Sequence, residues 1–242
     1  MKKLNHIVSA LFVMLFLCTL SLTAQSLSGV PGLVQAPTAD FMKDGTFYIG
    51  GNYLPKERLS YSNYRYNGGV LFVSLTFLPY IEVNMRFTKQ LGRPSYMRHT
   101  MDRAPGVRVR LWRETQQRPA VVFGIHDVFS TVADGRARHF GATYVVCTKR
   151  FMYGSFLIAP SLGFGFDFFK AQGKELMGIF GGVRIRSTYF KPLAVLVDYD
   201  TQFLNFGLDF YATHGFRLKV GFLSFRYFVA GMSMHFNLFD VF

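Results

Sequence analysis

The C-terminal stretch of the chain, Leu223 to Phe242, alternates between apolar and small or polar residues with a period of two. Its apolar series is Phe228, Ala230, Met232, Met234, Phe236 and Leu238, and the residues between are Val229, Gly231, Ser233, His235 and Asn237. Period two is that of a β-strand, in which successive side chains point to opposite faces. A strand with one continuous apolar face, ending the chain on an aromatic residue, is typical of the closing strand of an outer-membrane β-barrel.

The same alternation recurs along the chain. It is clearest in residues 80–88, where Ile81, Val83, Met85 and Phe87 alternate with Tyr80, Glu82, Asn84, Arg86 and Thr88. Twelve segments carry a strand pattern: 46–54, 69–77, 80–88, 107–112, 118–130, 140–151, 154–166, 176–187, 192–200, 203–212, 214–222 and 223–242. The sequence therefore predicts an all-β fold, a transmembrane antiparallel β-barrel of about twelve strands in the outer membrane.

The composition favours a barrel over a helical membrane protein. Half of the residues are hydrophobic and 17% are aromatic, which is too apolar for a soluble chain with so little helical pattern. Beyond the N-terminal stretch, however, no apolar run reaches the roughly eighteen residues of a membrane helix. A closed barrel spans lipid with strands of about ten residues and leaves no unpaired edge.

The first 24 residues have the pattern of a secretory signal peptide. They combine a basic start, an apolar core from Ile7 to Leu22, and a small-residue cleavage site after Ala24. A retained membrane anchor is one alternative. A lipoprotein signal that uses Cys18 is another, but bulky residues precede Cys18, where lipid attachment needs small ones. Removal of Cys18 would leave Cys147 as the single thiol, so no intrachain disulfide is expected.

The expected organisation has three parts. Residues 1–24 are the signal peptide, residues 25–43 form a periplasmic segment that leads into the barrel, and residues 44–242 form the outer-membrane barrel. The middle part is rich in Pro and Gly and lacks a period, so it is not expected to be a strand.

The chain is strongly basic, with 27 Lys and Arg against 14 Asp and Glu and a formal net charge of +13. Removing Lys2 and Lys3 with the signal peptide leaves 13 − 2 = +11. Anionic outer-membrane lipid, above all lipopolysaccharide at the rim, is an expected partner, and an acidic polymer passing nearby is a candidate. Nucleic acid is not expected, because a signal peptide and lipid-facing strands argue against it. The alternative is that most of these residues lie in solvated loops.

Several blocks together resemble the YjbH family, outer-membrane proteins of Gram-negative bacteria associated with exopolysaccharide and capsule production. They are GLVQAPTADFMKDGTFYIG (Gly32 to Gly50), Pro79 to Val83, FGIHDV (Phe123 to Val128), YVVCTKRF (Tyr144 to Phe151), and VDYD followed by NFGLDF (Val197 to Phe210). Their order and spacing agree along most of the chain. Typical members are much longer, and this chain matches one barrel-like portion of them. It also has Val197-Asp198 where the family pattern has Glu before Tyr-Asp.

The resemblance implies a role without catalysis in the export or surface assembly of a polysaccharide or capsule. It implies a location in the cell outer membrane of a Gram-negative bacterium. Acidic polysaccharide and periplasmic export proteins are then the candidate partners.

Charged residues on the lumen faces of the expected strands are the candidate site. The alternation places there Glu82, Arg86, Arg108, Arg110, Arg184, Arg186, Asp198, Asp200 and Asp209, and the blocks shared with the family add Asp127, Lys149 and Arg150. The candidate polysaccharide contacts are Arg86, Arg108, Arg110, Arg184 and Arg186, and the other seven form a lumenal charge network. Either bidentate arginine–carboxylate pairs merely fill and neutralise the lumen, or the side chains hold or guide acidic sugars.

No enzymatic activity is expected, but one alternative is a small lipid-modifying enzyme such as an acyl hydrolase. Ser233 and His235 share a face of the last strand and could form a nucleophile–base pair. A hydrolase would also need an orienting group and an oxyanion hole. A plain pore or structural barrel is the other alternative. None of the six His residues lies two or four positions from another, so no metal or cofactor is expected.

Overall fold

The computed structural model describes residues 25–59, 66–92, 101–129, 140–168, 174–212 and 215–240, so the expected signal peptide lies outside the described residues. The strands are β1 (Thr46–Leu54), β2 (Gly68–Phe77), β3 (Ile81–Gln90), β4 (Asp102–Trp112), β5 (Ala120–His126), β6 (Ala142–Thr148), β7 (Phe151–Tyr153), β8 (Phe156–Phe166), β9 (Gly178–Ser187), β10 (Leu193–Tyr199), β11 (Leu204–Tyr211), β12 (Phe216–Leu223) and β13 (Tyr227–Asn237). Within those ranges, no helix is both long and apolar enough to cross a membrane.

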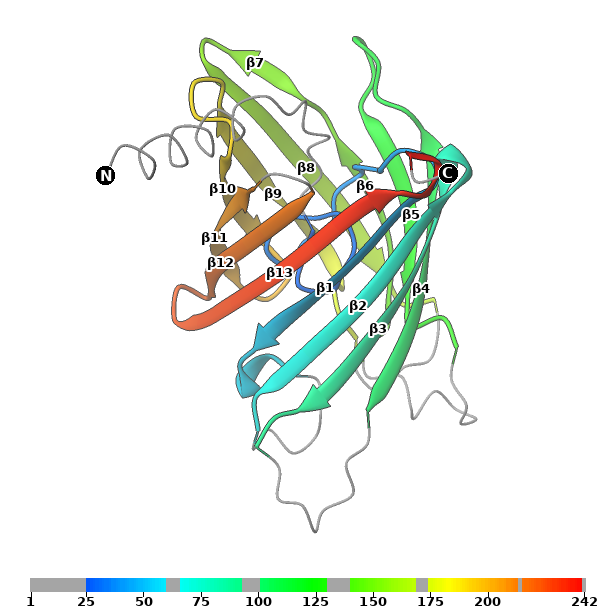
Figure 1. Cartoon of the computed structure of the whole chain (residues 1–242), viewed down its shortest axis with the longest axis vertical. Helices are drawn as coiled ribbons and strands as arrows, with labels where there is room; N and C mark the ends of the chain where they lie inside the picture. Colours follow the sequence, from blue (N-terminus) through cyan, green and yellow to red (C-terminus); the bar gives the residue numbers. More distant parts are fainter. Residues whose placement is uncertain are drawn as a thin grey trace, which may run out of the picture.

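Twelve strands close into an antiparallel barrel, as the sequence predicts. Strands that follow one another pair from β1 to β6 and from β8 to β13, β13 pairs with β1, and β6 pairs with β8 (Figure 1). The short strand β7 also pairs with β8 and continues the line of β6. The predicted all-β antiparallel barrel is confirmed, because every pairing between these strands is antiparallel and the ring that they form has no open edge.

The two ends of the barrel differ in the length of their connections. At one end, which we call the short-turn end, the connections are 78–80, 113–119, 154–155, 188–192 and 212–215. At the other, the long-connection end, they are 55–67, 91–101, 127–141, 167–177, 200–203 and 224–226. Both the start of β1 and the end of β13 lie at the short-turn end, since Thr46 pairs with Asn237.

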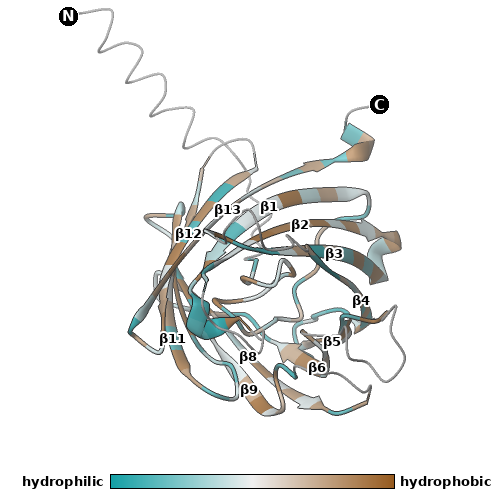
Figure 2. Cartoon of the chain, turned by 90° about the horizontal axis from the view of Figure 1, so that it is seen from below, coloured by the Kyte–Doolittle hydropathy of each residue, from teal (hydrophilic) through white to brown (hydrophobic). Residues whose placement is uncertain are grey.

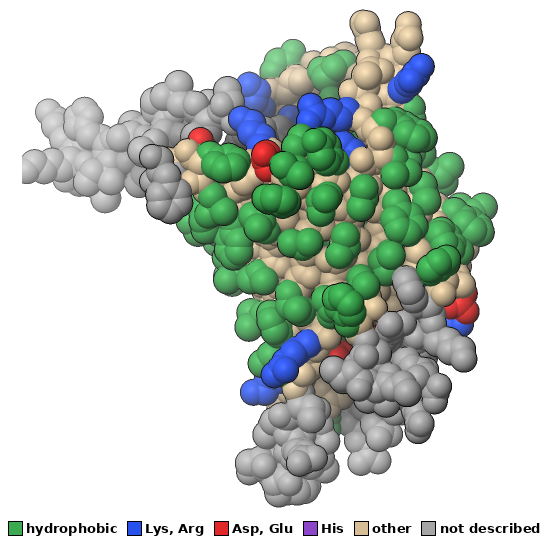
Figure 3. Space-filling model, turned by 90° about the vertical axis from the view of Figure 1, so that its right-hand side faces the viewer, with side chains coloured by type: hydrophobic (Ala, Val, Ile, Leu, Met, Phe, Trp, Pro, Cys, Tyr) green, Lys and Arg blue, Asp and Glu red, His purple; other side chains and the backbone are tan. Residues whose placement is uncertain are grey.

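The apolar faces of the strands point outward, as the alternation predicts. In β3, Val83 is 41% exposed while the neighbouring Glu82 is fully buried, and in β13 Met232 is 58% exposed while Val229 is buried. Apolar side chains accordingly cover the outer wall, with charged side chains toward its ends (Figure 3). The lumen faces therefore carry the polar residues.

Strand β4 begins at Asp102, five residues before the expected strand 107–112. Pro105 lies inside this strand, although proline has no N–H to donate to the hydrogen-bond ladder of a sheet. The carbonyl of Pro105 accepts a hydrogen bond from the amide of Val128 at 2.8 Å, beyond the end of β5. The backbone nitrogen of Pro105 points to the same side, where no strand needs a donor, so the proline removes no ladder bond.

The expected strand 140–151 is interrupted at Lys149 and Arg150, between β6 and β7. Pro160 of β8 lies opposite the interruption, and its carbonyl accepts the amide of Lys149 at 3.2 Å. Pro160 offers no N–H in return, so the ladder cannot be completed there. The amide of Arg150 instead donates to Oε1 of Glu114 at 2.6 Å, and its guanidinium reaches into the lumen.

Residues 25–42, which we call the plug, run inside the barrel. The view along the barrel shows this coil surrounded by the strands (Figure 2). Leu27, Val30, Leu33, Val34 and Ala36 are each at most 1% exposed. The backbone bonds largely to itself, with Leu27 N donating to Val34 O, Leu33 N to Ala36 O and Thr38 N to Pro31 O at 2.8–3.0 Å. The segment expected to lead into the barrel therefore occupies its lumen, as a series of turns that its Pro and Gly residues permit.

Apolar side chains that face the lumen pack on the plug. One cluster joins Leu27, Leu33, Val34 and Met42 of the plug to wall residues that include Tyr48, Val70, Phe72, Leu196 and Val229. A second joins Ala36 and Ala39 to wall residues that include Val122, Tyr144, Val146 and Phe180. Because the hydrophobic effect favours burial of these surfaces, the plug and the wall stabilise one another.

The Phe72 ring is held between a glycine of the plug and a glycine of the wall. A Cβ added to Gly29 would lie 2.5 Å from Cγ of Phe72, and one added to Gly50 would lie 2.4 Å from its Cζ. Gly29 also has a φ of +86°, in the region that favours glycine. The close fit of plug and wall thus depends on both glycines.

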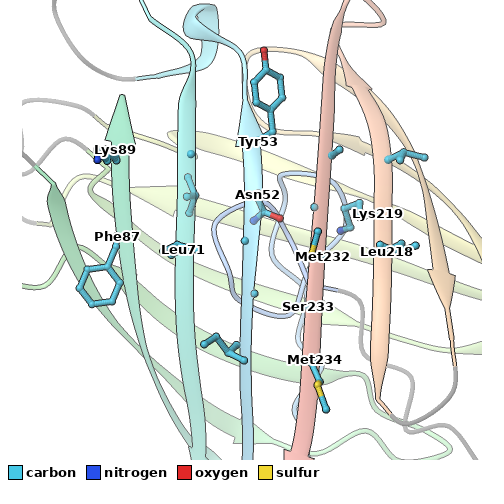
Figure 4. A pocket seen from close by; sticks show the side chains of 18 of the residues that line it. Asn52, Tyr53, Leu71, Phe87, Lys89, Leu218, Lys219, Met232, Ser233 and Met234 are labelled. Carbon is cyan, nitrogen blue, oxygen red and sulfur yellow. The ribbon is translucent and has the colours of Figure 1, made fainter. Parts of the chain in front are cut away.

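The outer wall carries an apolar hollow of about 890 Å³ across β12, β13, β1, β2 and β3. It forms where the small Gly51 lies in register between Leu71 of β2 and Met232 of β13. In the close view, Asn52 and Lys219 extend from the same strands toward the plug (Figure 4), where they bond to its carbonyl oxygens. This patch of wall is therefore apolar outside and hydrogen-bonded to the plug inside.

We expect Gly50→Val to lower the free energy of unfolding by about 1–3 kcal/mol, the usual cost of overpacking a filled interior. The added side chain would displace Phe72 from its place against Gly29. Denaturant unfolding of the protein in detergent measures the change. Gly51→Ala on the outer face is the control and should change stability by less than about 0.5 kcal/mol. Equal stability of the two variants would contradict the tight fit of plug and wall.

Candidate functional site

Polar side chains from around the barrel hold the plug. Hydrogen bonds reach it from Asn52 of β1, Ser74 of β2, Arg108 of β4, Thr148 of β6, Arg184 of β9, Asp198 of β10 and Lys219 of β12. A buried coil needs such partners, because an unsatisfied backbone group away from water costs free energy. The lumen side chains therefore replace the strand partners that the plug lacks.

Asp198 caps the middle of the plug. Its Oδ2 accepts the amides of Gln35 and Ala36 at 2.7 and 2.8 Å, and its Oδ1 accepts Nδ2 of Asn205 at 2.9 Å. The side chain is fully buried. A carboxylate that accepts several N–H bonds is a strong local anchor, so Asp198 fixes the plug against β10 and β11.

Arg108 connects the wall to the plug from β4. Its Nη1 donates to Oε1 of Glu82 at 3.0 Å, and its Nη2 donates to the carbonyl oxygens of Thr38 and Asp40. Bidentate arginine–carboxylate pairs are one of the two alternatives that the sequence leaves open for the lumen. The structure joins Arg108 and Glu82 through one nitrogen only, because the other nitrogen binds the plug backbone.

Asp40 is the carboxylate of the plug that takes two arginines. Its Oδ2 accepts Nη2 of Arg184 at 2.7 Å, and its Oδ1 accepts Nη2 of Arg150. Burial by itself would raise the pKa of Asp40, but Arg184 and Arg150 outweigh it and hold that pKa below its ordinary value. Because the folded-state pKa is lowered, this pairing stabilises the fold at pH above the ordinary value of about 4 and is lost only as the pH falls below it.

Lys219 holds the start of the plug, and the sequence analysis did not single it out. Its Nζ donates to the carbonyl oxygens of Gln25 and Leu33 and lies 3.9 Å from Oδ1 of Asp209. The signal was present in β12, where Arg217 and Lys219 alternate with apolar residues. Period two thus assigns both side chains to the lumen face.

Two expected site residues pair toward the long-connection end. Arg86 lies 3.8 Å from Oε2 of Glu175, and its Cζ is 3.8 Å from the centre of the Phe140 ring. Asp200 pairs with Arg58 of the connection after β1. These contacts tie long connections to the wall rather than to the plug.

Two further expected residues lie at the ends of the barrel. Asp127 follows β5 with a φ of +57°, and its Oδ2 accepts the amide of Phe140 at 3.4 Å. Lys149 donates to the carbonyl oxygens of Thr115 and Gln116 in the connection after β4. The charges expected to form one network are thus divided between the plug and the two ends.

Arg110 and Arg186 differ from the other expected arginines because, in the described part of the chain, neither makes an ion pair with a carboxylate. The Cζ of Arg110 lies 4.5 Å from the centre of the Phe41 ring. Nη1 of Arg186 is buried without a hydrogen-bond partner. Arg217, which the sequence analysis did not name, likewise has Nε and Nη1 buried without one, with its Cζ 4.7 Å from the Tyr211 ring centre.

Ser233 and His235 share the lumen face of β13, as the alternation predicts. No hydrogen bond joins their side chains in the described structure, and Arg217 lies opposite Ser233 in register. The backbone amide of His235 donates to Gly215 O at 3.2 Å. Over the described ranges, no group of three or more His, Cys, Asp and Glu side chains could hold a metal ion.

We expect Asp40→Asn to loosen the plug. Removing one partner of a buried ion pair lowers the free energy of unfolding by about 3 kcal/mol or more. Because Arg150 is partly exposed, we expect a loss near the lower limit of that range. Denaturant unfolding and limited proteolysis with mass spectrometry should show lower stability and new cleavage within residues 25–42. Asp167→Asn, which removes an exposed pair with Lys174, is the control and should change stability by less than about 1 kcal/mol. An Asp40→Asn protein as stable and protease-resistant as the control would contradict the role of Asp40.

Comparison with known proteins gives a family match over almost the whole chain. The family model described as "Exopolysaccharide biosynthesis protein YbjH" matches residues 24–241. A curated relative, the "Uncharacterized lipoprotein YjbH" of Escherichia coli (strain K12), is 29% identical over 150 residues, 59% of this chain and 19% of that protein. The matched region thus spans about a fifth of the length of that relative. The chain belongs to the YjbH family of exopolysaccharide biosynthesis proteins.

Proposed function

We propose that the protein is an outer-membrane barrel that takes part in the export or surface assembly of an exopolysaccharide, without catalysing a reaction itself. The observation that carries the proposal is a closed barrel with an apolar outer wall and a basic, plugged lumen, in a family described by exopolysaccharide biosynthesis. Acidic polysaccharide, lipopolysaccharide and periplasmic export proteins are the proposed partners.

The shape of the barrel supports an outer-membrane location. Bacterial outer-membrane barrels have an even number of strands, short periplasmic turns, longer outer loops and an apolar outer band. Here twelve strands join through short turns at the end where β1 starts and β13 ends, and long connections lie at the other end. In this orientation the short-turn end faces the periplasm, where export partners would meet it.

The plug argues against a plain open pore. The lumen contains a coil whose apolar residues are almost fully buried, and seven wall strands bond to it. A barrel filled in this way conducts only after the plug moves. The proposed role is therefore in assembly or gated passage of polymer rather than in free diffusion of small solutes.

The enzymatic alternative has less support from the geometry. A hydrolase needs a base oriented by a third group and a nucleophile within hydrogen-bond reach of that base. In the described residues, the partner in register with Ser233 is the cationic Arg217, and no carboxylate hydrogen bond orients His235. A lipid-modifying function through these two residues remains the second candidate because they share a lumen face.

A deletion strain tests the proposal. Under conditions in which the polymer is made, its loss from the cell surface is expected, with lipid A and phospholipid profiles unchanged. Complementation with the wild-type protein and with Ser233→Ala should both restore the polymer. Unchanged surface polymer in the deletion strain would refute the proposed role. Altered lipid A that Ser233→Ala fails to correct would favour the enzyme instead.

A further inference from the structure

We propose that the short-turn end of the lumen binds the anionic groups of an acidic saccharide chain through Arg110 and Arg186. The inference rests on the proposed function and names the substrate class and the site. Five arginines form a cluster around the end of the plug: Arg108, Arg110, Arg150, Arg184 and Arg186. The members of this cluster differ in whether they have an acidic partner.

Charge in the cluster does not balance. Asp40 of the plug pairs with Arg150 and Arg184, Glu82 pairs with Arg108, and Glu114 pairs with Arg150. Glu114 also lies 4.0 Å from Nζ of Lys149, so these three carboxylates are shared by Arg108, Arg150, Arg184 and Lys149. Uncompensated charge that is removed from water costs free energy unless a counter-charge binds. Arg110 and Arg186 are left without a carboxylate partner in the described residues.

Arg110 and Arg186 are placed where a ligand can reach them. Both lie near the short-turn ends of their strands, two residues from the end of β4 and one from the end of β9, and both are only half-buried. The guanidinium of Arg110 lies over the ring of Phe41, and Nη1 of Arg186 is buried with no hydrogen-bond partner. In the described residues, neither guanidinium donates a hydrogen bond or pairs with a carboxylate.

The surroundings of both arginines are mostly positive. Arg113 and Arg108 have the largest electrostatic effect on Arg110, with Glu82 and Asp40 opposing them, and Arg184 and Arg150 act on Arg186. Arg217, the second residue of β12, lies over the Tyr211 ring, with Nε and Nη1 buried and without hydrogen-bond partners. A cleft lined by one sign of charge concentrates ligands of the opposite sign. The field at this end of the lumen thus favours an anion.

Arg110 and Arg186 come from two different walls of the lumen. Strands β4 and β9 are separated in the ring by β5, β6 and β8. Successive acidic residues of one saccharide chain can therefore pair with Arg110 on one wall and with Arg186 on the other. The planar guanidinium fork suits carboxylate and phosphate groups, which are the charged groups of such chains.

Binding of a defined probe to the full protein in detergent tests the inference. The probe is a fluorescent uronic-acid oligosaccharide, measured by anisotropy, with a neutral glucose oligomer, inorganic phosphate and a polyglutamate peptide as competitors. The double variant Arg110→Gln/Arg186→Gln should bind the probe at least about tenfold more weakly, the loss expected for charged hydrogen bonds. The matched control Arg103→Gln/Arg226→Gln removes two exposed charges from the long-connection end and should stay within about twofold of wild type.

The outcomes separate the site from its alternatives. Displacement of the probe by the unlabelled uronic-acid oligomer, and not by the glucose oligomer, phosphate or polyglutamate, supports a saccharide site. Equal competition by phosphate or by polyglutamate would overturn saccharide recognition, and unchanged affinity of the double variant would overturn the assignment of Arg110 and Arg186. The double variant should also be as stable as wild type, because it removes like charges. These binding results do not depend on the deletion phenotype, so the site and the proposed function can fail separately.

Discussion

The buried carboxylate of Asp40 is the interaction on which the arrangement of plug and wall most depends. It lies between Arg184 of β9 and Arg150, which comes from the interruption between β6 and β7. Either arginine without Asp40 would leave positive charge in a confined lumen, and Asp40 without them would be a buried anion with no counter-charge. The plug and the wall thus require each other electrostatically, in addition to their apolar packing.

The same dependence explains why the lumen is charged at all. A barrel filled only by apolar side chains would satisfy neither the amides of Gln35 and Ala36 nor the carbonyl oxygens of Thr38 and Leu33. Asp198, Arg108 and Lys219 supply those partners. Lumen charge in this protein is therefore first a means of holding a coil inside a barrel. Arg110, Arg186 and Arg217 have no carboxylate partner in the described residues, and the first two are half-buried near an end of the lumen, where a ligand can reach them.

The strand architecture could be predicted because it follows from local pattern. Alternation in residues 80–88 and in the C-terminal stretch fixes which face is apolar, and it gave the twelve wall strands and the lumen position of Glu82, Arg108 and Arg184. The start of β4 before Pro105 and the break between β6 and β7 opposite Pro160 could not be predicted, because each depends on how the proline lies against its neighbour strand.

The plug could not be found in this way. Residues 25–42 have no period, and their contacts join positions more than a hundred residues apart, such as Asp40 with Arg184 and Ala39 with Thr148. Composition predicts turns there but does not indicate where the turns lie. Arg150 faces the lumen because the ladder breaks at Pro160, which no local pattern shows. The lumen position of Lys219 could have been predicted, since charged and apolar residues alternate in β12 as clearly as in the strands whose lumen residues were assigned.

Residues 25–42 fill the lumen in the folded protein, and hydrogen–deuterium exchange of the protein in detergent can test this placement. The amides of Gln35 and Ala36 donate to the buried Asp198, and that of Ala39 donates to Thr148. A seated plug predicts that peptides covering these amides exchange as slowly as peptides from β3 and β10. Complete exchange within seconds, with the wall strands still protected, would show that the plug lies outside the barrel and would contradict the account.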